Sequence, residues 1–172
     1  GYLWDPPNAK KAFLEAINIA KASNTKVALS LSDAFCVDRY RSEFLDLVRT
    51  HVDILFGNET EILSLYQTEN LNEATELVQD DCEIVAVTRD SRGSIVIENR
   101  RVFEIEAQKI DTVIDTTGAG DLYASGFLYG MTRDMDIRQC GRLGGLAASS
   151  IITQFGARPG ESLMPLIDRV SV

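Results

Sequence analysis

Short apolar runs alternate with amphipathic helical segments along most of this chain, and this alternation constrains its fold most strongly. The runs at 26–31, 53–56 and 83–87 are short and apolar, as buried strands are. Buried strands separated by helices are typical of βαβ units, whose mostly parallel sheet is covered by helices on both faces. The sequence therefore predicts an α/β fold with three layers, in the order helix, sheet, helix.

Helical spacing of apolar residues and local capping signals predict where the other elements lie. The segment Asp5-Pro6-Pro7 supplies a capping side chain and then proline, so a helix should begin close behind it. Asn99-Arg100 separates two runs rich in β-branched residues, which predicts a hairpin. The expected helices span 8–23, 38–50, 59–66, 71–79, 119–133, 136–154 and 162–170, and the expected hairpin strands span 94–98 and 101–106.

Composition excludes several classes of protein. The chain has 172 residues and a formal net charge of −9, whereas a nucleic-acid-binding domain normally carries a basic patch. Binding to anionic lipid is disfavoured for the same reason, and no apolar run reaches the ~18 residues of a membrane span. Cys36, Cys82 and Cys140 are far apart, so we expect neither a disulfide scaffold nor a zinc site. A reducing cytoplasm is the expected compartment.

The segment DTTGAGD, residues 115–121, precedes a predicted helix. Its glycines let successive backbone N–H groups turn toward a ligand, and a helix N-terminus adds partial positive charge. Gly118, Ala119 and Gly120 are therefore predicted to form an anion hole suited to a phosphoryl group. Asp121 has two interpretations. Either it only complements the helix dipole, or it is the base that takes a proton from the hydroxyl group that receives the phosphoryl group.

The longer string DTTGAGDLYASGFLYG contains neither a Walker A loop nor a complete Rossmann fingerprint. It closely resembles the second signature of the ribokinase-like (PfkB) sugar and nucleoside kinases, D-T-x-G-A-G-D followed by a small or aromatic stretch and G-F. The resemblance implies a ribokinase-like fold and an ATP-dependent kinase in which Asp121 is the catalytic base and residues 118–120 form the anion hole. It also implies a monovalent cation, K⁺, at Asp115 and Thr117.

Asn58 and Glu61, in the string FGNETE, open a predicted helix and are three residues apart. This spacing is that of a capping box. The resemblance implies a second role, because the N-x-x-E of these kinases organises Mg²⁺ and its waters near the transferred phosphate. Magnesium usually keeps several waters and takes few protein ligands, so the two interpretations are compatible.

Two further segments resemble the nucleotide-binding parts of the family. In VTRDSRGS, Thr88 and Gly93 match the T-x-G-x-x-G turn along the nucleotide, whereas Asp90 stands where glycine is usual. A plain polar turn is the alternative. In the predicted helix 136–154, the resemblance makes Gly145 and Ala148 candidates to contact the adenine of ATP. Tight packing of small residues against the sheet is the alternative for that helix.

The strings VDILFGNETE and LSDAF are similar to those of adenosine kinases in particular, which favours adenosine as acceptor; a ribokinase- or fructokinase-like sugar kinase is the alternative. The resemblance covers residues 1–172 but corresponds only to the C-terminal, nucleotide-binding part of one kinase domain, without its N-terminal part and lid. The interpretation of the chain as a non-catalytic nucleotide-binding fragment is therefore a further alternative. The expected partners are ATP, Mg²⁺ and a small acceptor, with neither nucleic acid nor membrane, and a homodimer is one possible assembly.

Overall fold

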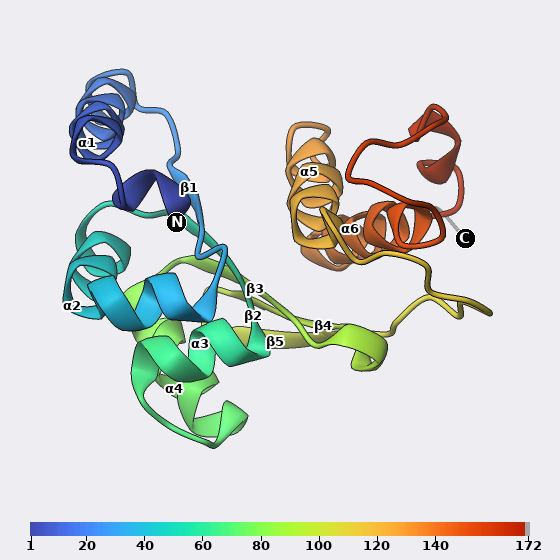
Figure 1. Cartoon of the computed structure of the whole chain (residues 1–172), viewed down its shortest axis with the longest axis horizontal. Helices are drawn as coiled ribbons and strands as arrows, with labels where there is room; N and C mark the ends of the chain where they lie inside the picture. The colour runs from blue at the N-terminus through green and yellow to red at the C-terminus, as the bar shows by residue number, and fades with distance from the viewer. Residues whose placement is uncertain (171–172) are drawn as a thin grey trace. The chain divides into compact units, whose positions relative to one another are not determined.

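A single five-stranded sheet runs through the computed structural model, which describes residues 1–170 (Figure 1). Its strands lie in the order β1-β2-β3-β4-β5. Strands β1 and β2 pair in parallel, with Ala28 opposite Ile54. The strands span Ala28–Ser30 (β1), Ile54–Asn58 (β2), Ile84–Thr88 (β3), Ser94–Glu98 (β4) and Arg101–Ile105 (β5).

Helices connect β1 to β2 and β2 to β3, as parallel neighbours require. The connection from β3 to β4, residues 89–93, is too short for such a crossover, so β4 runs antiparallel to β3. The connection from β4 to β5, Asn99-Arg100, is shorter still, so β5 runs antiparallel to β4 and in the same direction as β3. All strands except β4 therefore share one direction, which confirms the expected α/β fold with a mostly parallel sheet.

The hairpin between β4 and β5 is also confirmed. Asn99 and Arg100 both have positive φ, 49° and 63°, as the two central residues of a type I′ turn do. The Arg100 guanidinium lies 2.6 Å from Asp80 Oδ1, which offsets part of the strain of a left-handed arginine.

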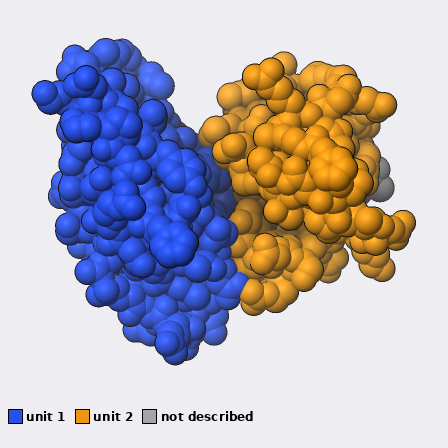
Figure 2. Space-filling model, viewed as in Figure 1, with its two compact units in different colours: residues 1–87, 97–101 blue, residues 88–96, 102–172 orange. Residues whose placement is uncertain are grey.

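The chain divides into two compact units (Figure 2). Unit 1 comprises Gly1–Val87 with Ile97–Arg101, and unit 2 comprises Thr88–Val96 with the described part of Val102–Val172. Unit 1 holds a short 3₁₀ turn, η1 (Tyr2–Trp4), and the helices α1 (Pro7–Ala22), α2 (Ala34–Thr50), α3 (Glu59–Tyr66) and α4 (Leu71–Asp81). Unit 2 holds η2 (Asp90–Arg92), α5 (Ala119–Met131), α6 (Ile137–Ile151) and η3 (Met164–Leu166).

The core of unit 1 begins close to the start of the chain. Trp4 is buried, and its ring meets Phe13 edge-on at 5.5 Å between centroids. Its indole N–H donates to Glu43 Oε2 at 2.9 Å, and Lys10 also binds this carboxylate. Helix α2 starts earlier than the expected residue 38, because Asp33 Oδ1 accepts the amide of Phe35 at 2.6 Å and caps the helix.

Glycines allow the two helices of unit 2 to approach closely. A Cβ on Gly126 would lie 2.7 Å from the carbonyl oxygen of Leu143, and one on Gly144 would lie 2.8 Å from that of Tyr123. Helix α6 also packs against the sheet, since a Cβ on Gly141 would lie 2.8 Å from Ile105 Cγ1. The prediction that small residues in this helix serve tight packing is therefore confirmed for these positions.

The expected helix at 162–170 was wrong. The segment forms only the 3₁₀ turn η3 and further turns, and its backbone bonds join each amide to the carbonyl three residues back, as from Ile167 to Met164 and from Val170 to Ile167. Pro165 lies within this segment, and proline has no N–H to donate and disfavours a helical residue before it. The buried Val170 nevertheless packs against Leu143 and Leu146.

Within residues 1–170, Cys36, Cys82 and Cys140 are buried and form no disulfide. The same residues contain no group of three or more His, Cys, Asp or Glu side chains arranged to hold a metal ion. None of the described helices is both long enough and apolar enough to cross a membrane.

Candidate functional site

The N-terminus of α5 has no side-chain cap. Helix α1, which starts after Pro6, also lacks one, whereas α2, α3, α4 and α6 are each capped by an Asp or Asn side chain. The N-cap of α5 is Gly118, whose φ of 81° is left-handed. A Cβ here would lie 2.7 Å from the Cβ of Ala157, so both the conformation and the space favour glycine.

This bare helix end has room for a ligand. A Cβ added to Gly120 would have no atom within 4 Å, and Asp121, in the first turn, is exposed. Ala119 donates its amide to the carbonyl of Thr116 at 3.1 Å. The amides of a helix's first turn have no acceptor within the helix and carry its partial positive charge. The structure thus places an accessible helix N-terminus and the solvent-exposed carboxylate of Asp121 together. The binding of an anion by residues 118–120 and the role of Asp121 as a base stay predictions.

Asp115 links the segment before α5 to the loop after α6. Its Oδ1 accepts the Thr117 hydroxyl at 2.7 Å and the Thr117 amide at 2.9 Å, and its Oδ2 accepts the Gly156 amide at 2.9 Å. These bonds, that of the Thr117 hydroxyl first, lower the pKa of Asp115 and keep it charged. Asp115 and Thr117 therefore lie together, as expected of a shared site, and their binding of K⁺ stays a prediction.

Asn58 and Glu61, at the start of α3 in unit 1, form the predicted capping box. Asn58 Oδ1 accepts the Glu61 amide at 2.8 Å, and the Asn58 amide donates to Glu61 Oε2 at 2.9 Å. The Asn58 side chain also donates to Glu61 Oε1 at 2.8 Å. Glu61 is only 5% exposed, and burial raises the pKa of its carboxyl group. The structure confirms the cap, and the role in organising Mg²⁺ stays a prediction.

The raised pKa of Glu61 predicts how stability responds to pH. Because the folded state holds the Glu61 proton more tightly than the unfolded state, this residue's contribution to stability falls as pH rises from its ordinary value of 4.5 through the raised pKa. Glu61→Gln has no such titration. The free energy of unfolding of Glu61→Gln, minus that of the wild type, should therefore increase over this window in urea titrations at a series of pH values. A difference that stays flat or decreases would contradict this account.

The turn after β3 contains two residues with positive φ. Asp90, which stands where glycine is usual, has φ 50°, and Gly93 has φ 79°. Aspartate is among the few residues that tolerate this left-handed region. A Cβ on Gly93 would lie 2.0 Å from the carbonyl oxygen of Ile105, so the turn packs closely against the end of β5. Thr88 ends β3 at the start of this turn.

The two consecutive glycines of α6 face different surroundings. Gly144 packs against Tyr123, whereas a Cβ on Gly145 would meet no atom within 4 Å. Ala148, half-buried, lies three residues after Gly145 and so on the same face of the helix. Packing therefore explains Gly144, and Gly145 and Ala148 present an open face of small residues.

A buried pair of hydroxyl groups in unit 2 was not predicted from the sequence. Ser94 and Tyr123 are 2% and 4% exposed, and their side-chain oxygens lie 2.8 Å apart. The sequence did indicate that the Tyr123 hydroxyl would be buried, because Tyr123 lies on the apolar side of the helix predicted at 119–133. A buried tyrosine hydroxyl usually has a hydrogen-bond partner.

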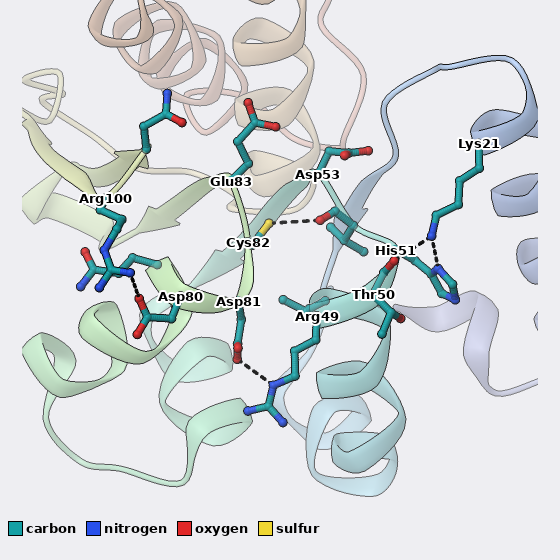
Figure 3. Close-up of a pocket in the computed structure, with 14 residues that line it drawn as sticks. Lys21, Arg49, Thr50, His51, Asp53, Asp80, Asp81, Cys82, Glu83 and Arg100 are labelled. Atoms are coloured by element: carbon teal, nitrogen blue, oxygen red, sulfur yellow. Dashed lines mark hydrogen bonds and ion pairs between the residues drawn. The ribbon is translucent and has the colours of Figure 1, made fainter.

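The hollow drawn in Figure 3 lies within unit 1, next to the first residues of β2 and β3. Its charged side chains have partners: Arg49 bonds Asp81 at 3.1 Å, and Lys21 lies 2.6 Å from His51 Nδ1. None of the predicted site residues lines it. His51, the single histidine of the sequence, lines this hollow.

Comparison with known proteins agrees with the fold and with these motifs. The model of the pfkB family of carbohydrate kinases matches residues 2–163. The structure of adenosine kinase from Sinorhizobium meliloti is 48% identical, with a TM-score of 0.95 over 98% of this chain and 52% of that one. A probable sugar kinase from Rhizobium etli CFN 42 is also 48% identical, with a TM-score of 0.96 over 99% of this chain and 52% of that one.

Curated relatives include a nucleoside kinase of Methanocaldococcus jannaschii, 32% identical over 77% of this chain and 42% of that protein. The chain spans about half the length of the relatives that it matches. The match of the family model over most of the chain confirms the resemblance seen in residues 115–121. The chain belongs to the pfkB family of carbohydrate kinases.

Proposed function

We propose that this chain is the C-terminal, nucleotide-binding part of an ATP-dependent kinase that phosphorylates the hydroxymethyl group of a nucleoside, adenosine in particular. The observation that carries the proposal is the N-terminus of α5, where an uncapped, accessible helix end lies beside an exposed carboxylate. Because the chain spans about half the length of its relatives, the proposal concerns the protein that contains it.

In this mechanism Asp121 accepts the proton of the acceptor hydroxyl group. The acceptor oxygen then forms a bond to the γ-phosphorus of ATP, the bond from that phosphorus to the β–γ bridging oxygen breaks, and ADP leaves with the electron pair. The amides of Gly118 and Gly120 at the start of α5 stabilise the negative charge on the moving phosphoryl group, whereas the amide of Ala119 bonds the carbonyl of Thr116. The negative charge of Asp121 serves the acceptor and not the phosphate.

Asn58 and Glu61 are suited to a hydrated Mg²⁺. They offer one carboxylate and one amide group, few ligands, as Mg²⁺ prefers when it keeps its waters. When bound, Mg²⁺ neutralises charge on the phosphates. The capping box holds both side chains in fixed positions for this role. Asp115 and Thr117 offer oxygen ligands to K⁺, and the lowered pKa of Asp115 keeps its charge available.

The relatives include both nucleoside kinases and sugar kinases, and the strings VDILFGNETE and LSDAF favour a nucleoside as acceptor. Besides the adenosine kinase of S. meliloti, the nucleoside kinases include a cytidine kinase of Thermococcus kodakarensis, 31% identical over 68% of this chain. A sugar is the second candidate, because a 5-dehydro-2-deoxygluconokinase of Listeria monocytogenes is 29% identical over 94% of this chain.

The proposal is tested on the intact protein, meaning the natural polypeptide that contains this chain. ADP release is followed with ATP, Mg²⁺ and one acceptor at a time: adenosine, cytidine, ribose or fructose. We expect the highest kcat/KM with adenosine and no turnover when Mg²⁺ is omitted. Turnover of a sugar but not of any nucleoside would support the second candidate. Binding of ATP without turnover of any acceptor would instead identify a nucleotide-binding protein that is not a kinase.

Gly145 provides a test of the ATP site that does not depend on turnover. Gly145→Ala should raise stability by about 0.5–1 kcal/mol, because alanine is the better helix former and the added Cβ has free space. Gly145→Leu should weaken ATP binding about tenfold or more, because a large side chain would fill the face proposed to contact adenine. Thermal unfolding and calorimetric titration with ATP measure the two effects.

Gly144→Ala is the matched comparison. Its Cβ would lie 2.8 Å from the carbonyl oxygen of Tyr123, so it should lower stability where Gly145→Ala raises it. Unchanged ATP affinity in Gly145→Leu would remove this helix face from the nucleotide site.

A further inference from the structure

The hydrogen bond between Ser94 and Tyr123 joins two parts of the proposed nucleotide site. Ser94 directly follows Gly93, the last residue of the turn proposed to lie along ATP, and begins β4. Tyr123 lies two residues after Asp121 in α5. The 2.8 Å bond between their side-chain oxygens therefore links the end of the turn to the helix whose N-terminus is the proposed anion hole.

Tyr123 is also fixed from the side of α6. A Cβ on Gly144 would lie 3.2 Å from two ring carbons of Tyr123, so the ring lies directly against that glycine. On its own helix the ring stacks with Phe127, with 6.3 Å between centroids and 27° between planes. A ring held in this way has one position, and its hydroxyl oxygen is correspondingly fixed.

The phenol stays protonated, and so can donate, at any physiological pH. Burial raises the pKa of Tyr123 to about 12. Ser94 is equally buried, so each hydroxyl depends on the other for a partner in a dry environment. The net stability from such a neutral pair is small, because both hydroxyls are hydrogen-bonded to water in the unfolded chain. The pair is therefore better suited to fixing positions than to holding the fold together.

We propose, on the basis of the proposed function, that Ser94 and Tyr123 are positioning residues. Their hydrogen bond holds the turn at 88–93 in place relative to the first turn of α5, so that the turn presents the phosphates of ATP to the anion hole. Neither residue needs to contact ATP or the acceptor. Loss of the bond should therefore impair the use of ATP and leave acceptor binding unchanged.

A double-mutant cycle in the intact protein tests this inference with Tyr123→Phe, Ser94→Ala and the double variant. Each single variant leaves one buried hydroxyl group without its partner, which should lower Tm. Each should also raise the Kd and the KM for ATP about fivefold, with the KM for adenosine changed less than twofold. The double variant has no unpaired hydroxyl, so its Tm should recover toward the wild-type value while its weak ATP binding persists.

The double variant separates positioning from packing. If ATP affinity recovers together with Tm, or if ATP affinity never changes in the single variants, the pair is merely structural and the inference is overturned. Tyr129→Phe is the control, since it removes a hydroxyl from the same helix, where the Tyr129 ring lies beside the Arg133 guanidinium at 5.3 Å. Its kinetics and Tm should match those of the wild type.

Failure of the proposed function would look different. A wild-type protein that binds ATP but phosphorylates no acceptor would contradict the kinase proposal, whereas the Kd for ATP across the cycle would still decide the role of the pair. A wild-type protein that does not bind ATP would overturn both.

Discussion

Asp121→Asn is expected to lower kcat by about 10²–10⁴-fold, the usual contribution of a general base. Asparagine keeps the size of the side chain but does not accept the proton of the acceptor hydroxyl group. The helix end proposed to bind phosphate is unchanged, because the groups that it offers belong to the backbone. The Kd for ATP should consequently stay the same or decrease, since a negative charge beside the phosphate site is lost. ADP-release kinetics and calorimetric titration with ATP provide the two measurements.

Asp136→Asn is a suitable control for this substitution. Asp136 caps α6 by accepting the amide of Gln139 at 2.9 Å, and asparagine caps helices equally well. It removes the same charge from another helix of unit 2 and should leave kcat unchanged. A kcat for Asp121→Asn within about threefold of the wild type, far from the usual effect of losing a base, would remove Asp121 from the mechanism.

Gly93→Ala is expected to be the most destabilising of the substitutions considered, by at least about 2 kcal/mol. Alanine at a φ of 79° and a ψ of −132° takes up a sparsely populated backbone conformation that costs roughly 1–3 kcal/mol. In addition, its Cβ would lie 2.0 Å from the carbonyl oxygen of Ile105, and this neighbour is backbone that yields only if β5 shifts. Urea denaturation followed by circular dichroism measures the change in the free energy of unfolding.

Gly156→Ala isolates the conformational part of this effect. Gly156 has a similar φ of 84°, but a Cβ there would have no atom within 4 Å. Its substitution should therefore cost only the roughly 1–2 kcal/mol of the left-handed backbone. Equal losses in the two variants would show that the contact with Ile105 is easily relieved, contrary to the packing described for this turn.

The parts of the fold that were predictable from sequence are those fixed by neighbouring residues. The hairpin followed from Asn99-Arg100 between two β-branched runs, and the capping box followed from the spacing of Asn58 and Glu61. The start of α5 followed from the glycines at 118 and 120. In each case the decisive interaction joins residues at most three or four positions apart, so the sequence alone contains it.

The errors arose where a local signal had two interpretations. Asp33, in the string LSDAF, caps α2. Because this string was compared only with family motifs and not considered as a helix start, the predicted start of α2 was too late. Pro165 interrupts a segment whose apolar spacing predicted a helix at 162–170, and its lack of an N–H outweighs that spacing. Asp90 has a left-handed φ of 50°, which an aspartate side chain tolerates but which no pattern in the sequence signals.

Interactions between distant segments could not be predicted at all. Ser94 and Tyr123 are far apart in sequence, as are Asp115 and Gly156, and each pair forms only because folded elements bring the two residues together. A tyrosine on an apolar helix face indicates that a partner exists, and only the three-dimensional structure shows which residue it is.

The position of Trp4 determines which events an optical experiment will detect. It is the one tryptophan of the sequence, and it lies in unit 1, in contact with Phe13 and hydrogen-bonded to Glu43. Indole fluorescence therefore responds to the loosening of unit 1, whereas far-ultraviolet dichroism reports on the helices of both units. A thermal unfolding curve recorded by tryptophan fluorescence alone would therefore not detect unfolding confined to α5 and α6, where the proposed base and anion hole are situated.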